Sequence, residues 1–406
     1  MFLELVVALV VGVVAGIFTG LIPGVHINLV SILLVSVSGY FLGFTSPLVL
    51  GVFIIAMSVT HSFLDSIPSV FLGAPDPDMA LAVLPGHRLL LEGRGYEAVK
   101  LTVIGSLLSL IMVVLLIPVL IPVVPFVYEF IQPYIGWILV AVVVYMILKE
   151  IGLLKKLWGT FVFMLSGILG IIVFSIPNLK QPLFPMLSGL FGVSTLLMSL
   201  TSNTEIPEQK ITEEIKVEKK NLVKAVGAAT FSGSLTGLFP GLGSAQAAII
   251  AIIAVQIVGD IGAHAFMVLI GGINTVNFVF SLATFFTLSK ARNGAIVAVM
   301  EILESINVYE LVVFLAVALI VGGIASFLAM KITKVFAKFI GKVNYRILCL
   351  SVIGFISVLV LYFSSFIGFL ILLVSTVVGL IPGLVNVKRS LAMGCLLLPV
   401  IYYFVF

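Results

Sequence analysis

Charged residues are scarce in this chain: Asp, Glu, Lys and Arg together make up 9% of its 406 residues, whereas 62% are hydrophobic. A soluble domain carries about 25% charged residues, so the composition excludes a soluble globular protein, and we expect no nucleic-acid partner. A membrane-spanning helix needs roughly 20 apolar residues, and the chain is long enough for about 10–12 membrane segments on that basis. We therefore predict an all-α polytopic membrane protein in contact with membrane lipids.

Cysteine and histidine are also rare. The two cysteines, Cys349 and Cys395, both lie in apolar runs, where we expect them to act as small packing residues. The four histidines are not clustered with carboxylates or thiolates, so the sequence predicts no metal site and no cofactor. The N-terminus, Met1–Leu5, lacks the basic region of a cleaved signal peptide, and the first apolar run is expected to remain as a helix.

A glycine–proline motif recurs within the apolar sequence. Gly-Leu-Ile-Pro-Gly occurs at Gly20–Gly24 and again at Gly379–Gly383, and Gly-Leu-Phe-Pro-Gly occurs at Gly237–Gly241. The first and middle copies belong to longer matching segments, because Ala15–Gly24 aligns with Ser232–Gly241. Breaks at equivalent points of two halves are typical of a transporter site made from discontinuous helices. The motif therefore predicts a duplication and the place of the site.

One charged, aqueous stretch divides the chain. We interpret residues 201–220 as a solvated cytoplasmic linker between a first membrane repeat, residues 1–200, and a second membrane repeat, residues 221–406. Beyond the motif, the repeats keep the order and spacing of several polar residues: Ser62 aligns with Asn277, and Ser66 with Ser281.

Basic residues predict the orientation of the two repeats, since Lys and Arg favour cytoplasmic loops. In the first repeat, the helix expected from Ala98 is preceded by Arg88 and Arg94 and ends without charge. Its partner helix, expected from Leu311, is preceded by acidic residues and ends in basic ones. The reversed asymmetry predicts two inverted-topology repeats, with both chain termini outside the cell.

Polar residues follow the first two motif breaks. His26 and Asn28 come after Gly24, and Ser244 comes after Gly241. Non-helical backbone in a membrane persists only where protein or a water-filled cavity satisfies it, and a helix that restarts there presents free N–H groups that favour anions. We expect the two breaks to frame one cavity. The alternative is a pair of proline kinks in closely packed helices.

A second set of polar residues interrupts apolar runs that are too short to span, as expected for re-entrant hairpins that line a cavity. The tip in the first repeat is acidic and the tip in the second is basic, so only the second can attract an anion directly. The alternative is that both tips reach the aqueous interface and are merely solvated. The predicted substrate-binding residues are Gly24, His26, Asn28, Ser66, Gly241, Ser244, Asn274, Asn277, Ser289, Lys290 and Arg292, and the candidates for a coupling Na+ or H+ are Asp65, Asp76 and Asp78.

Several segments follow the signatures of a known family. They are Gly16–Gly24, Ile67–Asp78, Pro85–Ala98 and Gly105–Ser106 in the first half, and Phe239–Ala247, Asn274–Asn277 and Thr287–Ala298 in the second. Together they resemble the large membrane subunit of the tripartite tricarboxylate transporters. The resemblance implies a prokaryotic cell-membrane protein that carries out secondary transport of carboxylates. It also implies two partners, a small membrane subunit and an extracellular binding protein.

Three classes of function follow from these patterns. We favour a secondary active transporter, or permease, that moves a small organic anion such as a carboxylate by symport with Na+ or H+. The alternative is a translocase for a lipid-linked phosphate of the polyprenyl phosphate type, which needs a lateral opening toward the lipid. An intramembrane enzyme is not expected, because Pro240–Ser244 matches a phosphatase loop only loosely and lacks its arginine. The sequence leaves the presence of a homodimer open.

Overall fold

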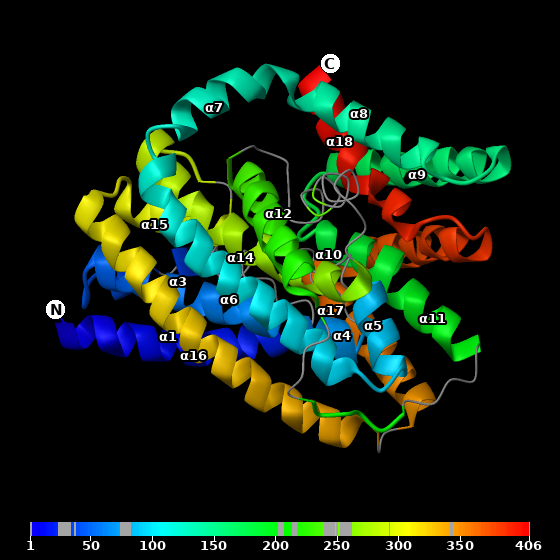
Figure 1. Ribbon diagram of the computed structural model, residues 1–406, viewed down its shortest axis with the longest axis horizontal. Helices are drawn as coiled ribbons and strands as arrows, with labels where there is room; N and C mark the ends of the chain where they lie inside the picture. Colours follow the sequence, from blue (N-terminus) through cyan, green and yellow to red (C-terminus); the bar gives the residue numbers. More distant parts are fainter. Residues whose placement is uncertain are drawn as a thin grey trace.

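A computed structural model describes most of the chain, and in the described residues it contains helices and turns but no strand. Eight of these helices are long and apolar enough to cross a membrane (Figure 1). This finding confirms the predicted all-α polytopic membrane fold. The described residues are 2–22, 34–35, 38–73, 83–201, 207–212, 217–238, 248, 251, 262–291, 293–341 and 344–405.

The helices before the linker form two groups along the chain. The first group contains α1 (Phe2–Leu21), α3 (Pro47–Leu64), α4 (Ser66–Phe71), α5 (Val83–Leu91) and α6 (Gly95–Leu120). The second contains α7 (Val124–Ile131), η2 (Gln132–Tyr134), α8 (Ile135–Leu148), α9 (Leu153–Ser175), α10 (Leu183–Leu187), the π-helical η3 (Ser188–Val193) and α11 (Ser194–Thr201).

The helices after the linker are α12 (Lys219–Leu238), α14 (Gly262–Leu288), α15 (Gly294–Leu303), α16 (Val308–Ile340), α17 (Tyr345–Leu384), η4 (Arg389–Met393) and α18 (Gly394–Val405). The α17 helix is interrupted at Ser365, whose backbone is not helical (φ 59°, ψ −167°). Its 40 residues would extend roughly 60 Å as one helix, about twice the thickness of the hydrocarbon core. The interruption divides α17 into two segments that each match a bilayer.

Glycines bring α1 against α3. A Cβ atom at Gly16 would lie 2.5 Å from the carbonyl oxygen of Met57, and one at Gly20 would lie 3.0 Å from that of His61. Such small residues allow the backbones of membrane helices to approach closely. Because the contacting residue numbers rise together along both helices, α1 and α3 run parallel.

The α12 and α14 helices pack in the same way. A Cβ atom at Gly233 would lie 3.0 Å from the carbonyl oxygen of Ile273, and one at Gly237 would lie 3.2 Å from that of Asn277. Since Gly20 and Gly237 are equivalent in the repeated motif, the shared contacts make His61 the counterpart of Asn277. The sequence alignment, which placed Ser62 there, is wrong by one residue.

The long helix of each half packs on the central helix of the other half. The α6 helix crosses α14 so closely that a Cβ atom at Gly105 would overlap the carbonyl group of Val268. The α16 helix packs on α3, where a Cβ atom at Gly51 would lie 2.9 Å from the ring of Phe314. The two halves are therefore interlocked around α3 and α14 (Figure 1).

Contacts at the helix ends establish directions. Arg94, the N-cap of α6, lies 2.6 Å from His264 in the first turn of α14, measured between Nη2 and Nε2. Ideal Cβ atoms at Gly93 and Gly341 would lie 3.0 Å and 3.6 Å from the backbone of Glu208. The start of α6 and the end of α16 thus lie together beside the linker, and the two helices run in opposite directions. This is the arrangement expected for inverted repeats.

A second interlocked group contains α9, α18, η3 and the later part of α17. Cβ atoms at Gly170 and Gly379 would overlap the carbonyl groups of Cys395 and Leu190 respectively, so the α9–α18 contact matches the α17–η3 contact. The third copy of the motif, Gly379–Gly383, therefore lies within a packed helix and has Gly170 as its counterpart. The corresponding positions of the first two copies, Gly24 and Gly241, lie outside the described residues.

Part of the linker is fixed to the first half. Gln209 is buried, and its side chain accepts a hydrogen bond from the N–H of Gly95 at 2.8 Å and donates one to the carbonyl of Leu90 at 3.0 Å. The Lys210 N–H also donates to the carbonyl of Gly93 at 2.8 Å. The expectation of a purely solvated linker is wrong here, because Gln209 caps the end of α5 and the start of α6 at once.

Candidate functional site

The two central helices carry the buried polar groups. In their most apolar stretches, 89% of the α3–α4 residues and 94% of the α14 residues are buried, whereas no other candidate span exceeds 44%. Helices that face lipid need no polar side chains, and polar residues inside a membrane bundle mark functional sites. The buried polar residues of these helices are Ser58, Thr60, His61, Ser62, Asp65, Ser66 and Ser69, together with Asn274, Thr275, Asn277, Ser281 and Thr284.

Asp65 and Asn274 join the two helices. The Nδ2 of Asn274 donates a hydrogen bond of 2.8 Å to Oδ2 of Asp65, and the two residues are only 5% and 3% exposed. Asn274 lies near the middle of α14, so the carboxyl group sits deep in the membrane-spanning part of the fold. A buried charge costs free energy unless it is paired or neutralised. The binding of a proton or a metal cation to Asp65 would therefore lower the free-energy cost of burying its carboxylate strongly.

The local sequence explains how Asp65 reaches α14. Asp65 lies between α3 and α4, and its side chain does not cap the N-terminus of α4. Pro68 has no N–H to donate to the carbonyl of Leu64, which loosens the helix at this point. The carboxyl group can therefore reach Asn274 on the neighbouring helix.

Two further predicted residues lie close to this contact. Ser66 is next to Asp65 and buried, and its hydroxyl donates to the carbonyl of Phe63 at 3.3 Å. Asn277 lies one turn after Asn274 on α14 and is 8% exposed. Residues three apart share a helix face, so Asn274 and Asn277 present two amides along the same side of α14.

The chain matches a known protein family over nearly its whole length. The model of the tripartite tricarboxylate transporter TctA family matches residues 6–394. The chain belongs to the TctA family. The uncharacterized protein MJ1079 of Methanocaldococcus jannaschii is similar to this chain. The two are 29% identical over 391 residues, which cover 94% of each chain. No solved structure matches. TctA proteins are components of a tripartite transport system, so this chain is a multi-pass membrane component of a transporter.

Two predicted residues of the TctA-family chain lie far from Asp65. The end of α14 is roughly 21 Å beyond Asn274 along the helix axis, and Ser289 and Lys290 are exposed there. Ser289 adopts a positive φ of 51°. Lys290 Nζ lies 3.4 Å from the hydroxyl oxygen of Tyr128 and 4.7 Å from the centre of its ring. The structure therefore brings Asp65, Ser66, Asn274 and Asn277 together, but not Ser289 and Lys290.

The remaining predicted residues lie outside the described parts of the chain. They are Gly24, His26, Asn28, Asp76, Asp78, Gly241, Ser244 and Arg292. Among the residues that are described, no group of three His, Cys, Asp or Glu side chains could hold a metal ion.

One polar cluster joins two helices in a way that the sequence did not predict. Arg94 donates to both carboxylate oxygens of Glu97 at 2.9 Å, and His264 Nε2 lies 3.5 Å from Glu97. Arg94 and Glu97 are three residues apart, a spacing that favours an ion pair on one helix face. His264 comes from the other half, and no spacing rule connects it to residues so distant in sequence.

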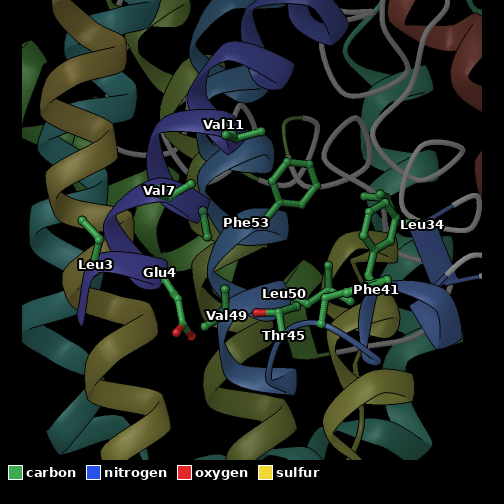
Figure 2. Close-up of a pocket in the computed structure, with 12 residues that line it drawn as sticks. Leu3, Glu4, Val7, Val11, Leu34, Phe41, Thr45, Val49, Leu50 and Phe53 are labelled. Carbon is green, nitrogen blue, oxygen red and sulfur yellow. The ribbon is translucent and has the colours of Figure 1, made fainter. Parts of the chain in front are cut away.

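The described part of this TctA-family fold has two grooves with mainly apolar linings. The first has a volume of about 530 Å³ and lies between α1, α3 and the segment before α3 (Figure 2). Its lining is apolar except for Glu4 and Thr45 near one end, as Figure 2 shows. The second groove, about 370 Å³, lies between α6, α7 and α12.

Proposed function

We propose that this TctA-family chain is a secondary transporter for a small carboxylate and that its transport is coupled to H+ or Na+ at Asp65. The observation that carries the proposal is the buried contact of Asp65 with Asn274 between the central helices of the two halves. Ionisable residues inside a membrane are costly and mark ion pathways and proton relays. A cation that binds Asp65 would alter the contact between α3–α4 and α14, and so link ion movement to the motion of the halves.

The substrate would bind beside this contact. Ser66 and Asn277 would supply neutral hydrogen bonds to the carboxylate, and the residues after the breaks at Gly24 and Gly241 would supply backbone N–H groups. These assignments, together with those of Asp76, Asp78 and Arg292, remain predictions. Because Lys290 is exposed at the end of α14, we expect it to bind an anion other than the transported carboxylate.

Inverted repeats suit this function because two similar halves can open a central site alternately to either side. The matching glycine contacts and the opposite directions of α6 and α16 support such a duplication. We infer that the end beside the linker faces the cytoplasm, since basic residues favour that side, and that both termini lie outside. The family also suggests a small membrane subunit and an extracellular binding protein as partners.

The test is transport by purified protein in lipid vesicles. A panel of mono-, di- and tricarboxylates would be screened for uptake driven by a pH or Na+ gradient. We expect Asp65→Asn to reduce accumulation driven by a tenfold ion gradient about tenfold, because that gradient stores about 1.4 kcal/mol per coupled cation that an uncoupled variant cannot use. Exchange of substrate without a gradient should persist. Glu301→Gln, which removes an exposed acid on α15, is the control. Unchanged accumulation by Asp65→Asn would disprove coupling at this residue.

The lateral apolar grooves favour the second candidate, a translocase for a lipid-linked phosphate. Glu4 argues against a phosphate at the first groove, because two negative charges repel. Movement of a fluorescent polyprenyl phosphate across the same vesicles, without carboxylate uptake, would select this alternative.

A further inference from the structure

The groove between α6, α7 and α12 is an apolar surface open to the membrane. Its lining includes Met112 and Leu116 of α6, Val124 and Val127 of α7, and Phe231 and Leu235 of α12. Phe231 is 60% exposed in the isolated chain, so this side of α12 faces lipid. A small carboxylate would gain nothing from such a lining, whereas a hydrocarbon chain would.

A cation lies next to the α7 wall of this groove. Tyr128 follows Val127 in sequence and shares a helix face with Val124, and its ring and hydroxyl contact the exposed Lys290. Within the described part of the chain, none of the ion pairs includes Lys290. The groove thus has a mainly apolar lining, and a positive charge lies beside its α7 wall.

Exposed aromatic residues lie on the segment that follows Val124. Phe126, Phe130 and Tyr134 are exposed on α7 and η2, and the Phe126 and Phe130 rings stack with their centres 6.3 Å apart. Tyrosine is enriched where a membrane protein meets the headgroups. Because Lys290 follows the last residue of the candidate span Gly262–Leu288, we place it at the depth of lipid phosphates rather than in the hydrocarbon core.

We propose that this groove holds an acyl chain of an anionic phospholipid whose phosphate pairs with Lys290. The complementarity has two parts: the lining buries hydrocarbon, and the lysine attracts the headgroup. The proposal concerns a site apart from the Asp65–Asn274 contact, so it does not depend on which substrate is transported.

The charged half of the site can be tested by native mass spectrometry of delipidated protein titrated with phosphatidylglycerol or phosphatidylcholine. Wild-type protein should bind phosphatidylglycerol more tightly. We expect Lys290→Gln to reduce the preference for phosphatidylglycerol about fivefold, because one lysine near an anionic surface contributes about 1 kcal/mol. Lys331→Gln is the matched control, since Lys331 also lies over a ring, 5.2 Å from the centre of Phe327, but not at this groove.

The apolar half can be tested by filling the groove. A Cβ atom at Gly227 would meet nothing within 4 Å, so Gly227→Leu should occupy the groove without disturbing the fold. It should weaken binding of both lipids, whereas Gly323→Leu, at an equally open position on α16, should not. Equal effects of the groove and control variants, or binding of glycerol phosphate as tight as that of the lipid, would overturn the proposal.

Discussion

At the scale of single residues, burial determines what an ionisable group can do. His87 on α5 illustrates this outside the membrane-spanning helices: it is 3% exposed, and its Nδ1 lies 3.2 Å from the carbonyl oxygen of Val70. Burial lowers the pKa of His87 below 6.5, and the hydrogen bond to Val70 offsets only part of that effect. The neutral ring is therefore the form that fits the folded protein.

This burial predicts a pH dependence of stability. Between the lowered pKa and 6.5, the unfolded chain binds more protons at His87 than the folded protein does, so stability rises with pH. The contribution of the neutral His87 ring to stability is complete above pH 6.5 and is lost as the pH falls toward the lowered pKa. The temperature at the midpoint of thermal unfolding should be lower at about pH 5.5 than at about pH 7.5. His87→Gln should reduce that difference. Parallel curves for both proteins would exclude a contribution from His87.

Polar residues in apolar sequence were the most predictable part of the candidate site. Asp65, Ser66, Asn274 and Asn277 were selected from the sequence because hydrocarbon penalises them, and the structure places them near one another. Gln209 gave no such signal, since a glutamine in a charged linker resembles any solvated residue. Its role depends on contacts with Leu90 and Gly95, which are distant in the chain.

At the scale of helices, glycine contacts determine the packing and its register. The repeated motif predicted the correspondence of Gly20 with Gly237, but the alignment of α3 with α14 slipped by one residue. Similar side chains occur on every face of such apolar helices, so sequence similarity cannot fix the rotation. Backbone contacts do fix it, because His61 and Asn277 offer their carbonyl groups to equivalent glycines.

The crossing of α6 and α14 predicts a severe effect of one substitution. Any side chain at Gly105 would overlap the backbone of Val268, and backbone cannot move aside as a flexible side chain can. Gly105→Val should therefore cost more than the ordinary penalty for overpacking, about 1–3 kcal/mol. Gly323→Val on α16, where a Cβ atom has no neighbour within 4 Å, is the matched control. Yield, monodispersity and thermal midpoint in detergent would be compared, and equal stability of the two variants would contradict the close crossing.

At the scale of the whole molecule, helix directions follow from contacts between the halves. Arg94 meets His264, and Glu208 lies beside both Gly93 and Gly341, so three helix ends meet at the linker. Charge asymmetry predicted only the opposite directions of α6 and α16, because the positive-inside rule acts on loops and needs no knowledge of packing. The interlocking of α6 with α14 and of α16 with α3 could not be predicted, since it depends on surfaces that form only after the helices are in place.

The directions lead to a test of topology with two single cysteines. Glu208 lies in the linker beside the end of α16, and Ser305 lies just before the start of that helix. Both residues are exposed. The native cysteines, Cys349 and Cys395, are buried, so wild-type protein should react little with a membrane-impermeant thiol reagent. Glu208→Cys should react only in inside-out vesicles, because basic residues place the linker in the cytoplasm. Ser305→Cys should react only in intact cells, since α16 spans the bilayer between the two positions. Labelling of both variants from one side would show that α16 does not cross the membrane, and the inverted arrangement of the repeats would then be wrong.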